Sequence, residues 1–139
     1  MKLVRSMHDL KCKIISIIHR WGLSILIMMV IFTFSSIPSA ELPSLGWFDM
    51  LVKKGGHILG YGILSMAYLR GLDMDKKNLW IAWLLSIIYS ITDEIHQIFV
   101  PGRHASVWDI GFDAVGAAIT LFLYRINNKK NPIWWKNTR

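Results

Sequence analysis

Four mostly apolar segments, each long enough for a helix that crosses a membrane, alternate with short polar stretches along the chain. About 20 mostly apolar residues are needed to cross the hydrocarbon core of a bilayer, and about 17 is the lower limit. The segment 21–37 contains no charge and ends before Pro38, whereas 79–100 is long enough but polar in its last third. The segments 52–70 and 105–124 contain ionisable residues and glycines, so we expect them to cross a membrane only with their polar faces turned into a helix bundle.

Upstream of the first span, apolar and basic residues alternate at helical spacing. A helix with one apolar face and a basic polar face lies in the membrane interface, where anionic headgroups attract it. The residues concerned are Leu10, Ile14, Ile17, Ile18 and Trp21, with Lys11, Lys13 and Arg20 between them. We therefore expect a short N-terminal interfacial helix. The chain then divides into a basic amphipathic segment at 1–20, a four-span membrane domain at 21–124 and a basic cytoplasmic tail at 125–139.

The composition excludes several other classes of protein. Hydrophobic residues make up 53% of the 139 residues and charged residues 18%, which is too apolar for a soluble domain of this size. The net charge of +7 does not indicate nucleic-acid binding, because the basic residues lie between apolar segments and not on a polar domain. The single cysteine, Cys12, excludes an internal disulfide and a cysteine-based metal site. A signal peptide ending at Ala40 is disfavoured, because three further candidate spans follow it.

The distribution of Lys and Arg predicts the orientation of the spans. Of the 16 such residues, five lie before the first span, three between the second and third spans, and five in the tail. The remaining three, at the opposite ends of the spans and so on the other side of the membrane, are Lys53, Lys54 and Arg103. Positively charged loops stay in the cytoplasm. We therefore expect an all-α integral membrane four-helix bundle with both termini cytoplasmic.

With this orientation, the polar residues of three spans lie at the same depth, in the outer half of the membrane. The set consists of Lys54, His57 and Tyr61 at the start of the second span, Asp93, Glu94 and Gln97 near the end of the third, Arg103 in the following turn, and Ser106, Asp109 and Asp113 at the start of the fourth. An ionisable side chain at the bilayer centre costs about 2.5–3.5 kcal/mol on insertion scales. Because lipid cannot satisfy their hydrogen bonds, we expect these groups to face one another in one outward-opening polar site.

Helical spacing extends these polar faces along each span. In the fourth span, Ser106, Asp109, Asp113, Gly116 and Thr120 fall on one continuous face. In the second span, Gly56, Gly60 and Gly62 would allow another helix to approach closely.

Structural interpretations of the same residues remain open. Asp93 or Glu94 would also serve as a helix cap or as a partner of Arg103, and Tyr61 as a packing aromatic.

Two stretches of the chain resemble the VanZ family of small bacterial membrane proteins. They read KGGHILGYGIL and DEIHQIFVPGRHASVWDIGFDAVG, and the resemblance covers about 23–124. The family carries K-x-x-H-x-x-x-Y on one span, then D-E-x-x-Q, a P-G-R turn, and S-x-x-D-x-x-x-N-x-x-G. The matching positions here are Lys54, His57, Tyr61, Asp93, Glu94, Gln97, Pro101, Gly102, Arg103, Ser106, Asp109 and Gly116. The chain departs from the pattern at Asp113, where the family usually has asparagine, and at Lys53, where it often has an acidic residue.

The resemblance implies a multi-pass protein of the bacterial cytoplasmic membrane with a role in the cell envelope. The namesake of the family is associated with low-level resistance to teicoplanin, a lipoglycopeptide that acts at the outer face of the membrane. Membrane lipids and lipid-linked envelope precursors are the expected partners, and a second copy of the chain is a further candidate.

Two functions fit the polar site. The first is binding of lipid headgroups or an amphiphilic glycopeptide, with Lys54 and Arg103 recognising phosphate or carboxylate. The binding residues would be Lys54, Tyr61, Gln97, Arg103, Ser106 and Asp113. The second is an enzyme acting on a lipid-linked substrate, in which His57, Asp93, Glu94 and Asp109 supply acid–base groups or hold a divalent metal. A small transporter that works as a dimer and a structural assembly partner are further alternatives.

Overall fold

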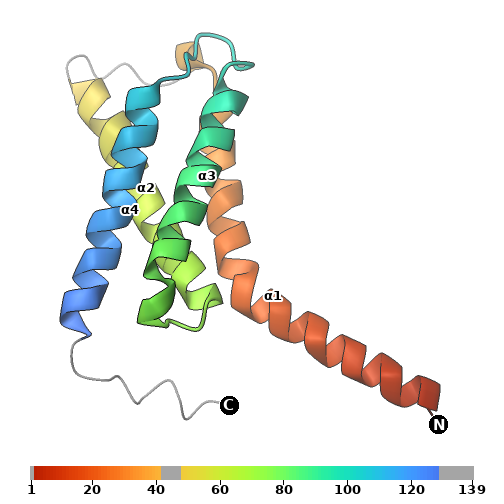
Figure 1. Cartoon of the computed structure of the whole chain (residues 1–139). Helices are drawn as coiled ribbons and strands as arrows, with labels where there is room; N and C mark the ends of the chain where they lie inside the picture. Colours follow the sequence, from red (N-terminus) through yellow and green to blue (C-terminus); the bar gives the residue numbers. More distant parts are fainter. Residues whose placement is uncertain (1, 42–47, 129–139) are drawn as a thin grey trace.

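The computed structural model describes residues 2–41 and 48–128, with side chains for 14–40 and 54–128, and within these ranges it contains helices and no strand. Each of the four expected spans corresponds to one α-helix (Figure 1). The helices are α1 (Lys2–Ser35), α2 (Phe48–Gly71), α3 (Leu79–Gln97) and α4 (Val107–Asn127), with short 3-10 helices η1 (Ser39–Glu41) and η2 (Lys76–Asn78). Most of the predicted tail, 129–139, lies outside the described residues.

Helix α1 joins the expected interfacial segment and the first span into one uninterrupted helix of 34 residues. No proline precedes Pro38, so the sequence contains no strong helix breaker between the two segments. At 1.5 Å per residue, α1 is about 50 Å long, which exceeds the roughly 30 Å of a hydrocarbon core. Figure 1 shows its N-terminal half leaving the other helices obliquely, while its C-terminal half packs beside them.

Helix α2 lies at the centre of the packing, since it contacts α1, α3 and α4 and packs most extensively against α4. Two glycines allow this close approach. A Cβ atom on Gly116 would lie 2.8 Å from the Cα atom of Ile58, and one on Gly62 would lie 2.5 Å from the hydroxyl oxygen of Thr120. Gly62 therefore has the packing role expected from the sequence, whereas no atom of another described residue lies in contact with the Cβ position of Gly56.

The C-terminal half of the polar face expected on α4, at Gly116 and Thr120, therefore packs against α2. Thr120 donates a hydrogen bond to the carbonyl of Gly116, 3.0 Å away in its own helix, so its polar group is satisfied locally. The polar face that remains available to a site comprises Asp109 and Asp113.

The distribution of polar and apolar side chains differs from that of a soluble domain. Among the described residues, as many polar as apolar side chains are buried. Large apolar side chains are exposed on every α-helix, for example Phe34 at 64%, Leu59 at 68%, Ile95 at 52% and Phe122 at 59%. Soluble proteins rarely expose contiguous apolar surface on this scale. Within the part of the chain described, two segments, Ile14–Ser35 and Val107–Asn127, are long and apolar enough to cross a membrane by length and composition.

Candidate binding site

Asp113 on α4 forms the centre of the polar site. One oxygen of its carboxylate lies 3.2 Å from Nδ1 of His57 on α2. The other accepts a hydrogen bond of 2.5 Å from the hydroxyl of Ser90 on α3. Asp113 and Ser90 are both fully buried, so these bonds replace the water that the groups lose on folding. The carboxylate therefore connects three helices.

Asp93 forms a second group of polar contacts, between α3 and α1. One of its oxygens accepts hydrogen bonds from the hydroxyl of Ser35 at 2.8 Å and from the side-chain amide of Gln97 at 3.1 Å. All three side chains are buried. Ser35 was not among the residues predicted for the site, because one serine at the end of an apolar span is ordinary. Its place in the stretch FSSIP, at the same end of the bundle as Asp93, is a signal that could have identified it.

Glu94, the neighbour of Asp93, points to a different helix. Its carboxylate accepts a hydrogen bond of 2.7 Å from the main-chain N–H of Ser106, which immediately precedes α4. A carboxylate at this position also interacts favourably with the helix dipole. The contribution of Ser106 is thus its main-chain N–H, since its hydroxyl makes no capping bond. Both carboxylates of the Asp-Glu pair are buried.

Lys54 and Asp109 form a half-exposed ion pair near the same end of α2 and α4. The Nζ atom of Lys54 lies 3.4 Å from the carboxylate of Asp109, and the two side chains are 35% and 30% exposed. The same ammonium lies over the ring of Phe112, 4.3 Å from its centroid. Lys54 therefore has two partners within the protein.

Arg103 fastens the turn between α3 and α4 to the end of α1. Its guanidinium donates to the carbonyls of Phe34 at 3.1 Å and Ile37 at 3.2 Å. These carbonyls lie at and just after the C-terminal end of α1, where cations are favoured. Gly102, at a φ of 72°, lets the turn form, and its carbonyl accepts from the hydroxyl of Ser39 at 2.5 Å. Among the described side chains, Arg103 makes these main-chain contacts and no ion pair with a carboxylate.

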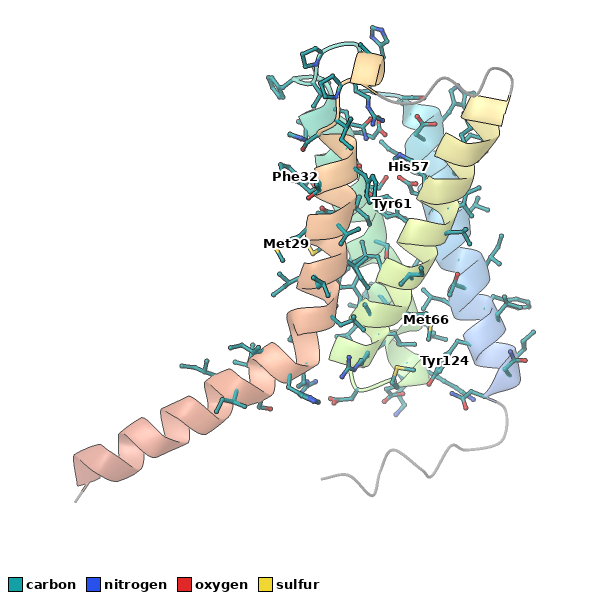
Figure 2. The ribbon with its side chains drawn as sticks, turned by 180° about the vertical axis from the view of Figure 1, so that it is seen from behind. Met29, Phe32, His57, Tyr61, Met66 and Tyr124 are labelled. Atoms are coloured by element: carbon teal, nitrogen blue, oxygen red, sulfur yellow. The ribbon has the colours of Figure 1, made fainter. Side chains whose placement is uncertain are left out.

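Tyr61 is completely buried beside His57 and Tyr89, with ring centroids 6.2 and 6.1 Å away. Figure 2 shows Tyr61 one turn below His57 on α2, with both side chains in the interior. The hydroxyl of Tyr61 lies near Ser90, but the two do not form a hydrogen bond of acceptable geometry.

The charged groups of these contacts lie close enough to interact electrostatically. The imidazole of His57 interacts with the charges of Asp113, Asp93 and Asp109. Glu94 interacts with His57 and with both carboxylates of α4. The ionisable groups predicted on α2, α3 and α4 therefore lie near one another, and α1 adds Ser35 as a fourth contributor. Arg103 is the exception, because it contacts the carbonyls at the end of α1.

His96 lies at the edge of this cluster. Its ring stacks on Phe32, with centroids 4.2 Å apart, and its Nε2 lies 3.0 Å from the hydroxyl of Ser36. These contacts attach the end of α3 to α1 and give His96 a packing role.

A metal centre would need several carboxylate and imidazole groups around one point. Within the described part of the chain, no group of three or more His, Cys, Asp or Glu side chains is arranged to hold a metal ion. The carboxylates are instead divided among separate hydrogen-bond partners. The divalent metal of the enzyme hypothesis therefore has no set of ligands that can be named here.

These features together define a small helical membrane protein with a polar site at one end of its packed helices. The chain belongs to the VanZ/LLP1 family, whose family model matches residues 20–128. The match confirms the resemblance seen in the sequence and extends it through α4. A search of curated proteins gave no match, and neither did a search of solved structures.

Proposed function

We propose that the chain crosses the bacterial cytoplasmic membrane four times, with both termini in the cytoplasm and the polar site open to the outside. The exposed apolar side chains on α2 and α3 support this, because outside a membrane these side chains would be in contact with water. The ionisable groups of α2 and α3 lower the mean hydropathy of these helices, but the groups have partners inside the protein. The concentration of Lys and Arg at the opposite end supports the orientation.

The orientation predicts which loops an external reagent can reach. In a Cys12→Ser background, Ala105→Cys should react with a membrane-impermeant maleimide in intact cells, because the exposed turn before α4 faces outward. Lys77→Cys, exposed at the opposite end of the helices, should react only after lysis. The reverse pattern would overturn the proposed orientation.

We further propose that the polar site binds the headgroup of a lipid or an amphiphilic glycopeptide, and thereby gives low-level resistance to teicoplanin. The observation that carries this proposal is the gradient of exposure from the Lys54–Asp109 pair to Asp113. The outer pair is about one-third exposed, His57 is 23% exposed and Asp113 is 1% exposed. A headgroup can therefore exchange its contacts with water for contacts with the outer pair and His57, while its acyl chains remain in lipid.

Binding should depend on the residues along this gradient. His57→Ala and Asp109→Asn should each weaken ligand binding by about tenfold or more, because each removes a hydrogen-bond partner that is charged or faces a charge. The corresponding measurement in cells is the teicoplanin concentration that inhibits a susceptible bacterial host expressing each variant at equal level. Asp75→Asn provides the control, since Asp75 is exposed in the loop at the other end. Full resistance in both site variants would contradict the proposal.

An enzyme acting on a lipid-linked substrate is the second candidate, favoured by the contact between His57 and Asp113. A carboxylate at Nδ1 fixes the tautomer and orientation of an imidazole, as general acid–base catalysis requires. The two candidates differ in what happens to the ligand. Mass spectrometry of ligand recovered from the purified protein should show an unchanged mass for a binder and a changed mass for an enzyme.

A further inference from the structure

Three polar atoms in the interior of the site have no hydrogen-bond partner among the described residues. They are one carboxylate oxygen of Asp93, one of Glu94, and the hydroxyl of Tyr61. Each of these side chains is at least 97% buried, with exposed fractions of 3%, 3% and 0%. An unpaired polar group at such a position costs about 1–3 kcal/mol, and more when it is charged. Native proteins retain few such groups, and each calls for an explanation.

The charges of the site are unbalanced in the same place. Asp109 is paired with Lys54, and Asp113 with His57. Within the described part of the chain, Asp93 and Glu94 receive hydrogen bonds from neutral donors alone, namely a hydroxyl, an amide and a main-chain N–H. Asp93 also lies close enough to His57 and to Tyr61 to interact electrostatically with both side chains. The buried part of the site is therefore acidic and short of donors.

The two cations expected to bind phosphate are already engaged. Lys54 contacts Asp109 and the ring of Phe112. Arg103 donates to the carbonyls at the end of α1. A phosphate entering the interior would have to displace these contacts and would lie close to Asp93 and Glu94, two carboxylates with no cationic partner among the described residues. Both effects oppose anion binding.

We propose that the buried part of the site, formed by Asp93, Glu94 and Tyr61, recognises a protonated primary amine on an amphiphilic ligand. This inference rests on the proposed binding function and names the chemical group that is recognised. A primary ammonium carries one positive charge and three N–H donors and has no acceptor. It would place a positive charge beside carboxylates whose printed hydrogen bonds come from neutral donors, and its N–H groups are donors of the kind that the unpaired oxygens can accept. The amine can come from a phospholipid headgroup or from an amphiphile without phosphate.

Binding of simple amphiphiles to the full-length protein in detergent tests this inference. The probes are dodecylamine, dodecyltrimethylammonium, dodecyl phosphate and a short-chain phosphatidylethanolamine. Dodecylamine should bind at least about tenfold more tightly than dodecyltrimethylammonium, which has the charge but no N–H donor. It should also bind more tightly than dodecyl phosphate. Tighter binding of phosphatidylethanolamine than of dodecylamine would identify a lipid headgroup as the source, whereas the reverse order would identify an amine without phosphate.

Two variants locate the amine in the site. Glu94→Gln keeps an oxygen for the N–H of Ser106 but removes the charge, and should weaken dodecylamine binding by about tenfold. Tyr61→Phe removes a hydroxyl that has no hydrogen-bond partner among the residues described, so the melting temperature without ligand should not fall while binding of the amine weakens. Asp75→Asn, at the other end of the molecule, should bind dodecylamine like the unaltered chain. Equal binding by Glu94→Gln and the unaltered chain would overturn the inference.

The outcomes also separate this inference from the function on which it rests. Tighter binding of dodecyl phosphate, lost in His57→Ala, would overturn amine recognition and leave the proposed binding site in place. Failure of all four amphiphiles to bind would contradict both. Stabilisation by Mg²⁺ or Ca²⁺ equal to that by dodecylamine would show that any cation suffices, and would overturn recognition of an amine.

Discussion

Replacing Gly116 with leucine is expected to separate α2 from α4 and to prevent stable folding. The Cβ position of Gly116 lies within 2.9 Å of the Ile58 main chain, and a main chain within a helix cannot rotate away as a side chain can. Overpacking of a well-packed interior usually costs about 1–3 kcal/mol. A contact with main-chain atoms in the most extensive helix interface should exceed that range. The measurement is the melting temperature of the purified protein in detergent, together with the yield of monodisperse protein.

Gly111→Leu is the matched control for this substitution. Gly111 lies on the same helix, one to two turns earlier, and no packing partner among the described residues lies within 4 Å of its Cβ position. The same change of residue should therefore alter stability by no more than about 0.5 kcal/mol. Equal losses in the two variants would show that the effect is general to α4 and that Gly116 does not determine the packing.

Replacing Asp113 with alanine is expected to cause the second-largest loss of stability. The substitution leaves Ser90 and His57, on two other helices, without their shared acceptor. Interhelical hydrogen bonds in membrane proteins contribute about 1–2 kcal/mol each by model-peptide measurements. We therefore expect a loss of about 2 kcal/mol in the free energy of unfolding, measured by denaturant titration in mixed micelles.

Two comparisons identify the cause of this loss. Asp113→Asn keeps an oxygen for Ser90 and a polar nitrogen for His57, and should lose less stability than Asp113→Ala. Asp109→Ala removes a carboxylate from a half-exposed ion pair on the same helix, and such pairs contribute at most about 1 kcal/mol. An Asp113→Ala variant no less stable than Asp109→Ala would contradict the central role of Asp113.

The four helices could be predicted because each follows from a simple feature of the sequence. The turn residues around Pro101 and Gly102 separate α3 from α4, and long apolar runs fill the helices between such breaks. The contact of His57 with Asp113 could also be anticipated in outline. Both lie on the polar face of their helix near the same end, and lipid leaves such groups no other partners.

Other parts of the site could not be predicted, because the sequence does not say which of several equivalent partners a group will choose. Arg103 had both carboxylates and helix-end carbonyls within reach of its turn, and it binds the carbonyls of Phe34 and Ile37. Adjacent residues on a helix diverge by about 100°, so burial of both Asp93 and Glu94 required acceptable partners on two sides. The structure provides these partners from α1 and from the start of α4.

Glycine carries the least information of all, because it has no side chain whose polarity reveals its surroundings. Gly116 continues the polar face of α4 in helical spacing, yet it lies against the backbone of α2. Gly56 and Gly62 look alike in the sequence, and only Gly62 is at a close helix crossing. Such positions depend on the rotation of two helices about their axes, which is set by the packing of many side chains together.

A double-mutant cycle between His57 and Asp113 tests most directly whether ionisable groups from different helices satisfy one another inside the protein. The measured quantity is the free energy of unfolding of the unaltered chain, His57→Ala, Asp113→Ala and the double variant. Direct pairing predicts that the double variant is scarcely less stable than Asp113→Ala alone, with a coupling energy of about 1 kcal/mol or more. Strictly additive losses would show that the two side chains do not interact, and would contradict a shared buried site.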